Sequence, residues 1–288
     1  MKIALIGSNG QLGTDLKKTI SAELLTNLDY PDFDLTQKEI IYEQLLKIKP
    51  DLVINTAAYN LVDRAEQFPD EALAVNHQGV KNLVDVCLEL DCLLVHYSTD
   101  YVFGGGVDRQ TPYIEDDLPA PLNQYGQSKL LGEREVTTRL KKYFVIRTSG
   151  LFGTAGSKGK GGNFIESIIK KTQSGESLKV VDDQILTPTY TLDLAKNIWK
   201  LIQTNNYGLY HITSEGQCSW YEFACEIINC LNLKADLQAI KSDELDLSAK
   251  RPAYSVLENN RLKKLGLNLM RNWQVTIPDY LKEKGYLE

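Results

Sequence analysis

The chain has 288 residues, of which 43% are hydrophobic and 24% charged, a composition that supports a packed globular core. Its formal net charge of −6 argues against the concentrated basic surface that nucleic-acid binding needs. No run approaches the roughly 20 apolar residues of a membrane span, and the five cysteines form no CxxC pair. The amino-terminal apolar run is too short for a signal peptide. We expect a soluble cytoplasmic protein, monomeric or homodimeric, with no nucleic-acid, membrane or metal partner.

Short β-rich runs alternate with amphipathic helical segments through the first half of the chain. The expected strands are "KIALIG" (2–7), "LLTNL" (24–28), "LVIN" (52–55), "CLLVHY" (92–97) and "YFVIR" (143–147). The expected helices lie near 11–20, 37–48, 64–90 and 123–140. Such alternation indicates βαβ units. It predicts an α/β fold with a doubly wound, Rossmann-type parallel sheet.

Beyond residue 147 the pattern becomes mixed. A Gly- and Lys-rich stretch at 153–164 precedes a helix near 163–174, a strand at 178–182 and helices near 191–203 and 219–231. We expect two interleaved units. The dinucleotide-binding Rossmann domain would hold 1–150 and about 178–208, and a smaller mixed α/β substrate-binding lobe would hold about 151–177 and 209–288. The loop with Lys158 and Lys160 would either close over a substrate diphosphate or be a solvated connector.

A glycine-rich loop, "GSNGQLG" (7–13), directly follows the first expected strand and opens the first helix. In this pattern Gly7 permits the tight turn, Gly10 lets the backbone approach a pyrophosphate, and Gly13 allows close helix–strand contact. The phosphates then meet free N–H groups at the helix N-terminus. The loop therefore predicts NADPH or NADH as cofactor, contacted by Gly7, Asn9, Gly10, Gln11, Leu12 and Gly13.

The end of the second strand bears on which dinucleotide binds. Asp29 would either accept a hydrogen bond from the adenosine ribose, which favours NADH, or simply shape the turn. No Arg or Lys stands at 29–36 to hold a 2′-phosphate. Asp34 and Leu35 are placed to touch the adenine edge. The preference between NADH and NADPH stays open at this point.

The stretch "STDYVF" (98–103) begins where an expected parallel strand ends, which is where such sheets bind ligands. Thr99 should therefore face the ligand crevice. Tyr125 and Lys129 are four residues apart at the start of the next helix, so they share one helical face. The Lys129 ammonium should lower the pKa of the Tyr125 phenol, which suits a group that transfers a proton. Thr99 should hydrogen-bond the same phenol oxygen.

This set of residues resembles the extended short-chain dehydrogenases/reductases, and the wider sequence resembles the dTDP-4-dehydrorhamnose reductase family. The matching stretches follow the family's order over nearly the whole chain: "GSNGQLG", "NTAAYNLVDRAE", "VNHQGVKNL", "HYSTDYVFGG", "PYIEDDLPAPLNQYGQSKLLGE", "RTSGLFG", "DDQILTPTYTLDLA", "YHITSEGQCSWYEFA" and "RPAYSVLEN". The resemblance implies NAD(P)H-dependent reduction of the 4-keto group of a nucleotide-linked 6-deoxyhexose. In the family the product is dTDP-L-rhamnose, a precursor of surface polysaccharides.

The resemblance also implies roles for individual residues. Tyr125 would protonate the developing alkoxide, Lys129 would hold the nicotinamide ribose, and Thr99 would position the keto oxygen. The matching stretches imply further cofactor contacts at Ala57, Ala58, Tyr59, Asn76 and Ser98. They imply substrate contacts at Tyr101, Val102, Phe103, Gly150 and Arg251.

Differences from related sugar-nucleotide enzymes indicate which reaction this chain is expected to catalyse. Asp100 is followed by Tyr101 rather than by the Glu of the 4,6-dehydratases, and no Cys lies in 98–103, unlike the epimerase-reductases that resemble the fucose-forming enzymes. Both absences favour a plain reductase. The family often has Trp where this chain has Gly150, and a glycine there would leave room for a different ketosugar. Arg251 would hold either a substrate phosphate or a structural carboxylate.

One alternative belongs to a different class. Chains that resemble this family also serve as non-catalytic, NADP-binding regulatory subunits of methionine adenosyltransferase. That role needs the glycine loop but not the complete set of Thr99, Tyr125 and Lys129. Because all three are present, the sequence favours the enzyme.

Overall fold

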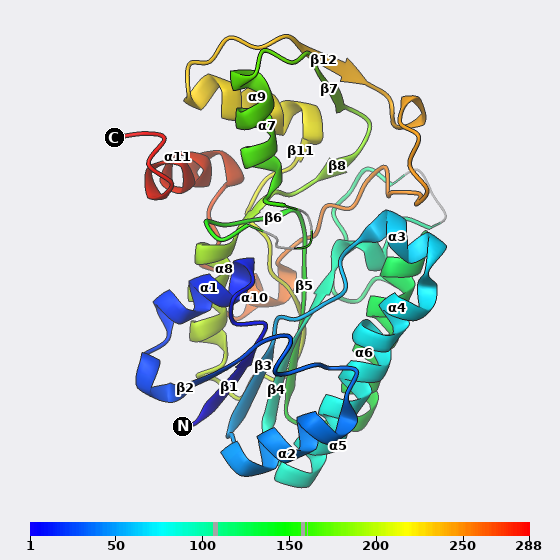
Figure 1. The fold of residues 1–288 in the computed structure, drawn as a ribbon, viewed down its shortest axis with the longest axis vertical. Helices are drawn as coiled ribbons and strands as arrows, with labels where there is room; N and C mark the ends of the chain where they lie inside the picture. Colours follow the sequence, from blue (N-terminus) through cyan, green and yellow to red (C-terminus); the bar gives the residue numbers. More distant parts are fainter. Residues whose placement is uncertain (106–108, 157–158, 160) are drawn as a thin grey trace.

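The structure, a computed structural model, describes residues 1–105, 109–156, 159 and 161–288. Figure 1 shows a large α/β lobe in the lower part of the view and a smaller lobe above it. The smaller lobe lies beyond one end of the central strands. The two lobes are interleaved in sequence, because the chain crosses between them more than once.

A six-stranded parallel sheet, in the order β10-β5-β4-β3-β1-β2, forms the centre of the large lobe. Its strands are β1 (Ile3–Ile6), β2 (Leu25–Leu28), β3 (Leu52–Asn55), β4 (Leu93–Thr99), β5 (Tyr143–Thr148) and β10 (Gly208–His211). The strand order reverses at β1, whose neighbours are β2 and β3. A crevice at the carboxyl ends of β1 and β3 is therefore the expected ligand position. The predicted fold class is confirmed.

Helices cover both faces of this sheet (Figure 1). On one face α1 (Gln11–Thr19) and α8 (Thr191–Leu201) pack against a core that includes Ile3 and Leu5. On the other, α2 (Lys38–Ile48), α5 (Val80–Leu90) and α6 (Gln124–Arg139) pack against Ala4 and Ile6. The alternation along β1 is that of a strand buried on both faces. Within the described ranges, no helix combines enough length and apolarity to cross a lipid bilayer.

The single helix expected near 64–90 is interrupted. The structure has α3 (Val62–Gln67), α4 (Pro69–Leu73), a π-helical stretch (Ala74–Gly79) and then α5. Pro69 stands at the start of α4, because proline lacks the N–H that an interior helix position must donate and its ring clashes with the preceding turn. The break turns the chain at the same end of the sheet as the crevice.

The smaller lobe is built from helices and short strand pairs around an aromatic core. Its helices are α7 (Phe164–Gln173), α9 (Trp220–Cys230) and α11 (Trp273–Glu283). Its strand pairs are β7 (Leu178–Val181) with β12 (Leu237–Ile240), β8 (Ile185–Leu186) with β11 (Cys218–Ser219), and β6 (Leu151–Phe152) with β9 (Thr189–Tyr190). The rings of Phe152, Tyr190, Phe223 and Tyr280 pack together at its centre.

Two strands lie elsewhere than the expected domain boundaries would place them. β7 pairs with β12, and its Leu178 and Val180 lie in the core of the smaller lobe, although 178–208 was assigned to the Rossmann unit. β10 completes the main sheet, although 209–288 was assigned to the substrate lobe. β7 keeps Lys179 exposed, which suits a sheet with one solvated face. The division into two domains itself stays a prediction.

Candidate active site

The glycine loop lies at the reversal point of the sheet. Gly7 has φ +75°, and a Cβ there would come within 2.7 Å of Thr56 Oγ1 and 2.8 Å of the Ala57 nitrogen. A Cβ on Gly13 would come within 2.3 Å of the Gly7 carbonyl oxygen. Both positions thus require glycine, one for its backbone conformation and one for close approach of α1 to the loop. The N-cap of α1, Gly10, offers no side-chain cap, which leaves first-turn N–H groups free for an anion.

Gly13→Ala should weaken dinucleotide binding by at least about ten-fold, because a displaced N-terminal turn no longer aims its N–H groups at the phosphates. The melting temperature should fall as well. A fluorescence titration with NADPH measures the first effect. Thr14→Ala changes the neighbouring residue of the same helix without entering the Gly7 carbonyl, so it should leave the affinity unchanged. Equal affinities for Gly13→Ala and the parent would remove the loop from the cofactor site.

Several residues in and near the glycine loop that were expected to contact the cofactor make contacts within the protein. Asp29 accepts hydrogen bonds from the backbone nitrogens of Asn9 at 2.8 Å and Tyr30 at 2.9 Å, which supports its role in the turn. Asp34 accepts from its neighbour Thr36 in a local turn. Leu12 and Leu35 are 5% and 4% exposed and belong to the two cores. Any contact of these two residues with the cofactor would therefore be made by their backbone atoms, and it stays a prediction.

Asn76 fixes the loop that follows β3. Its side-chain oxygen accepts from the Tyr59 nitrogen, and its amide donates to the Tyr59 carbonyl and to Ser128 Oγ, each at 2.9 Å. With 1% exposure, Asn76 is a support for the 57–59 loop and for α6. Its expected role as a direct cofactor contact stays a prediction. Ala57 and Ala58 lie in that loop, and the Ala57 backbone lies against Gly7.

The start of α6 brings Tyr125 beside the end of β4. Asn123 caps the helix by accepting from the Gly126 nitrogen at 2.8 Å. A Cβ on Gly126 would come within 2.2 Å of the Tyr101 carbonyl oxygen, so only glycine lets the helix approach this closely. The rings of Tyr101 and Tyr125 meet edge to face at 5.8 Å, and the Thr99 hydroxyl lies near enough to the Tyr125 phenol to influence its pKa. Thr99, Tyr101 and Tyr125 are thus brought together.

The charges in the site differ from the prediction. Burial raises the pKa of Tyr125 to about 12, against the opposing effect of the nearby Thr99 hydroxyl. Burial also lowers the pKa of Lys129 to about 8, against the opposing charge of Glu133. Lys129 Nζ donates to the Tyr97 carbonyl at 2.5 Å and does not set the pKa of the phenol, which corrects the expected lowering. A pKa this high keeps Tyr125 protonated at neutral pH, as a proton donor must be.

A buried ion pair continues from Lys129 along the same helical face. Glu133 lies one turn beyond Lys129 and accepts from Arg147 Nε at 2.9 Å and Nη2 at 2.7 Å. Both side chains are nearly inaccessible, at 3% for Glu133 and 4% for Arg147. Arg147 Nη1 also faces His211 Nε2 at 3.5 Å. Our sequence analysis missed this pair, although the spacing of Tyr125, Lys129 and Glu133 on one face was visible.

Asp100, directly beside Thr99, accepts hydrogen bonds from three hydroxyl groups, and our sequence analysis did not predict this. Its Oδ1 accepts from the Thr99 hydroxyl at 3.1 Å, and its Oδ2 accepts from Ser149 Oγ at 2.9 Å and Ser255 Oγ at 2.6 Å. Burial raises the pKa of Asp100 to about 6, and the three hydroxyls oppose that shift. The sequence offered one signal, a polar residue at or just after each strand end. Ser98 Oγ nearby is buried and has no hydrogen-bond partner among the residues that the structure describes.

Two of the expected substrate contacts have enclosed side chains. Val102 and Phe103 are 0% and 1% exposed and lie in a small core where Phe103 stacks on Tyr113 at 4.1 Å. Gly150 has φ +52°, and a Cβ there would come within 2.9 Å of Leu186 and 3.1 Å of Pro188. The glycine is required by its backbone and by its neighbours, so it does not stand where a larger side chain could fit. Substrate contact by these three residues stays a prediction.

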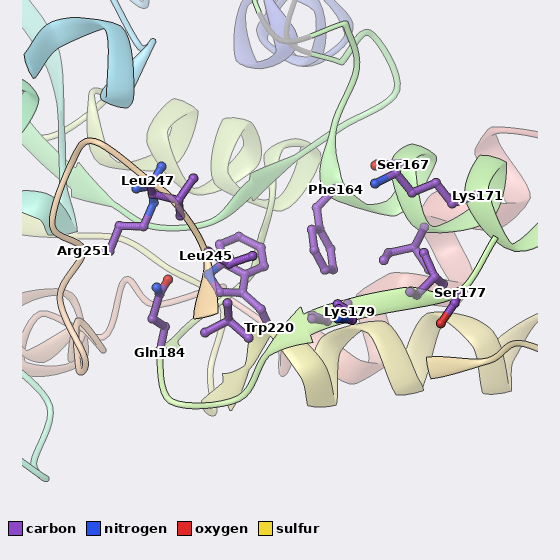
Figure 2. Close-up of a pocket in the computed structure, with 14 residues that line it drawn as sticks. Phe164, Ser167, Lys171, Ser177, Lys179, Gln184, Trp220, Leu245, Leu247 and Arg251 are labelled. Carbon is purple, nitrogen blue, oxygen red and sulfur yellow. The ribbon is translucent and has the colours of Figure 1, made fainter. Parts of the chain in front are cut away.

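Arg251 lies at a cavity of about 270 Å³ in the smaller lobe. Figure 2 shows Phe164, Trp220 and Gln184 among its lining residues. Arg251 pairs with Asp63 of α3 through Nη2–Oδ2 at 2.6 Å and Nη1–Oδ1 at 3.1 Å. In this structure it therefore holds a structural carboxylate, the second of the two roles expected from the sequence. The expected loop residues Lys158 and Lys160 lie outside the described residues.

The structure combines a parallel sheet that has a glycine loop at its reversal point with a Tyr–Lys pair on α6, beside the end of β4. These features define a class of protein, the extended short-chain dehydrogenases/reductases. Within that class, the family model described as "RmlD substrate binding domain" matches residues 1–285. The chain therefore belongs to this family, and the resemblance read from its motifs is confirmed.

Individual relatives agree along their whole length. The chain is 35% identical to the spore coat polysaccharide biosynthesis protein SpsK of Bacillus subtilis (strain 168), over 99% of this chain and 98% of the relative. It is 34% identical to a dTDP-4-dehydrorhamnose reductase of Aggregatibacter actinomycetemcomitans, over 95% and 96%. A crystal structure of dTDP-4-dehydrorhamnose reductase from Bacillus anthracis in complex with NADP matches with a TM-score of 0.93 and 37% identity, over 98% and 100%.

Proposed function

We propose that the chain reduces dTDP-4-dehydro-L-rhamnose to dTDP-L-rhamnose with NADPH or NADH. The observation that carries this is the meeting of Thr99 and Tyr125 at the carboxyl end of β4, with Lys129 one turn further along α6. Family membership and the names of the relatives support the same substrate and cofactor.

The residues around the crevice suit a dinucleotide. The conformation of Gly7, the close approach at Gly13 and the uncapped start of α1 would hold the pyrophosphate, and the orphaned Ser98 Oγ would gain a partner. The bound reduced nicotinamide supplies the hydride. Lys129 would turn from the Tyr97 carbonyl to the nicotinamide ribose. Because its pKa is about 8, its amine is largely protonated at neutral pH and can donate hydrogen bonds to the ribose hydroxyls.

The chain's own chemistry is proton donation and alignment. Tyr125 gives its phenol proton to the keto oxygen as negative charge develops there, and Thr99 hydrogen-bonds the same group. Tyr101 borders the sugar position. Arg251 would exchange Asp63 for the substrate diphosphate, since guanidinium binds both in the same bidentate way. The cavity behind Arg251 would then receive the nucleoside.

A turnover assay tests the function. The purified protein is mixed with NADPH or NADH and with 4-keto-6-deoxyhexoses linked to dTDP, UDP, GDP or CDP, and cofactor absorbance is followed. We expect the fastest decay with dTDP-4-dehydro-L-rhamnose. If cofactor absorbance falls fast only with another ketosugar, that ketosugar is the substrate in place of dTDP-4-dehydro-L-rhamnose. Dinucleotide binding with no decay for any sugar would instead support the regulatory-subunit alternative. A cytoplasmic location and a monomeric or homodimeric state remain predictions.

A further inference from the structure

A segment of residues 248–257, here called the linking segment, joins the two lobes at the active site. It runs between β12 of the smaller lobe and α10 (Asn260–Lys264), which packs by β10 of the main sheet. Its Arg251, with the preceding Leu245 and Leu247, forms one wall of the cavity (Figure 2). Whatever holds the linking segment therefore also positions this wall.

Among the contacts that bind the linking segment to the large lobe, three involve side chains of that lobe at 3.1 Å or less. Asp63 of α3 holds the Ala249 nitrogen at 3.1 Å in addition to Arg251. Asn123, which caps the Tyr125 helix, donates to the Lys250 carbonyl at 2.8 Å. Ser255 donates its hydroxyl to Asp100 at 2.6 Å. Two of the three partners thus adjoin groups assigned to the chemistry, because Asp100 follows Thr99 and Asn123 begins the helix of Tyr125.

Among these contacts, that of Asp100 is the most enclosed. Asp100 is 3% exposed and Ser255 is 3% exposed, so water cannot replace the hydrogen bond when it breaks. Ser149, just after β5, donates to the same carboxylate oxygen. Asp100 is therefore held from the sheet by Ser149 and itself holds the linking segment through Ser255.

We propose that Asp100 is a positioning residue: it docks the linking segment through Ser255 and thereby places Arg251 and its cavity wall for the nucleotide diphosphate of the substrate. The proposal rests on the proposed function for the identity of that ligand. It assigns Asp100 no contact with the reacting atoms. It predicts that loss of the Ser255 contact weakens nucleotide binding and leaves dinucleotide binding at the glycine loop intact.

The contact should also depend on pH. The ionised carboxylate accepts stronger hydrogen bonds than the neutral acid, and the pKa of Asp100 is about 6. Ser149 keeps Asp100 in place when the Ser255 contact breaks, so the undocked carboxyl stays buried, loses one donor and has a pKa above about 6. Docking is therefore favoured at higher pH, and as the pH falls through about 6 docking should weaken and nucleotide affinity should drop. The ionisable groups that face Asp100 are Tyr101 and Tyr125, and the charge of Arg251 lies near Tyr101. Tyr101 and Tyr125 have raised pKa values and stay neutral across this range, and Arg251 stays charged.

The test compares Ser255→Ala and Asp100→Asn with Ser248→Ala, a control in the same segment whose exposed serine accepts one long hydrogen bond, from Gln67 Nε2 at 3.4 Å. Calorimetry measures binding of dTDP as its sugar ester dTDP-glucose, whose phosphates, unlike the terminal phosphate of free dTDP, do not titrate near pH 6, and separately of NADPH, at pH 7.5 and pH 5.5. We expect Ser255→Ala to weaken dTDP binding about ten-fold or more at pH 7.5, as for loss of a hydrogen bond to a charged group, with NADPH affinity unchanged. Asp100→Asn should remove the difference in dTDP affinity between the two pH values. Ser248→Ala should behave as the parent.

Carbon-13 NMR of the aspartate carboxyls gives a readout that needs no ligand. The signal lost in Asp100→Asn should titrate near pH 6 in the parent, and about one unit higher in Ser255→Ala, because a donor to the charged form is gone. An unmoved midpoint, parent-like dTDP affinity in Ser255→Ala, or a pH dependence that persists in Asp100→Asn would each overturn the proposal. So would equal losses of dTDP and NADPH affinity, which indicate only general damage. A parent that binds dTDP but turns over no ketosugar would defeat the proposed function and not this inference.

Discussion

Tyr125→Phe is expected to lower kcat by a factor of about 10² to 10⁴, the usual contribution of a positioned general acid. The ring would keep its edge-to-face contact with Tyr101, so the fold and the dinucleotide site should be preserved. Only the proton donor for the keto oxygen is removed. Steady-state kinetics with the ketosugar, and a separate NADPH titration, measure the two quantities.

Tyr101→Phe is the matched control for that substitution. It removes a hydroxyl from the neighbouring ring, which borders the sugar but has no assigned proton to give. Its effect should appear mainly in KM, with kcat within a few-fold of the parent. Parent-like turnover by Tyr125→Phe would remove the role assigned to Tyr125, whereas an equal loss in both variants would show that the site needs both hydroxyls.

Glu133→Gln is expected to cost about 3–5 kcal/mol of stability, because it leaves the buried Arg147 charge without its carboxylate. Both side chains are almost fully enclosed, so solvent cannot screen the charge. Urea unfolding followed by circular dichroism measures the loss. The site should respond as well, because Glu133 supports the charge of Lys129.

A double variant separates the unpaired charge from lost packing. Glu133→Leu with Arg147→Met replaces the pair by apolar groups, and such replacements of buried pairs are often neutral or stabilising. The double variant should therefore be more stable than Glu133→Gln alone. If Glu133→Gln unfolds at the same urea concentration as the parent, another group compensates Arg147 and the assigned pairing is wrong.

The features of the fold that depend on local sequence were predictable. The five strands expected in the first half of the chain are present because each is a short β-rich run; the sheet buries four of them on both faces, and only β2, at its edge, is partly exposed. The glycine loop and the Tyr–Lys spacing were equally local signals. Local sequence could not predict which lobe holds β7 and which holds β10, because that depends on the distant strand with which each one pairs.

The electrostatics of the site could not be predicted from spacing. The i, i+4 arrangement of Tyr125 and Lys129 suggested a lowered phenol pKa, but burial outweighs the ammonium and Lys129 bonds the Tyr97 carbonyl instead. The resemblance to the family implied that Val102 and Phe103 contact the substrate. A single 3-10 turn at Asp100–Val102 breaks the alternation and directs both side chains into a core. The Asp100–Ser255 contact joins residues too distant in sequence for any periodic pattern to indicate.

A crystal structure of the protein with NADPH tests the central claim most directly. The account predicts that the nicotinamide ribose lies within roughly 3 Å of Lys129 Nζ, the distance of a hydrogen bond, and that the Tyr125 hydroxyl points to the space above the nicotinamide. A dinucleotide bound with its nicotinamide away from Tyr125, or with Lys129 still bonded only to the Tyr97 carbonyl, would contradict it.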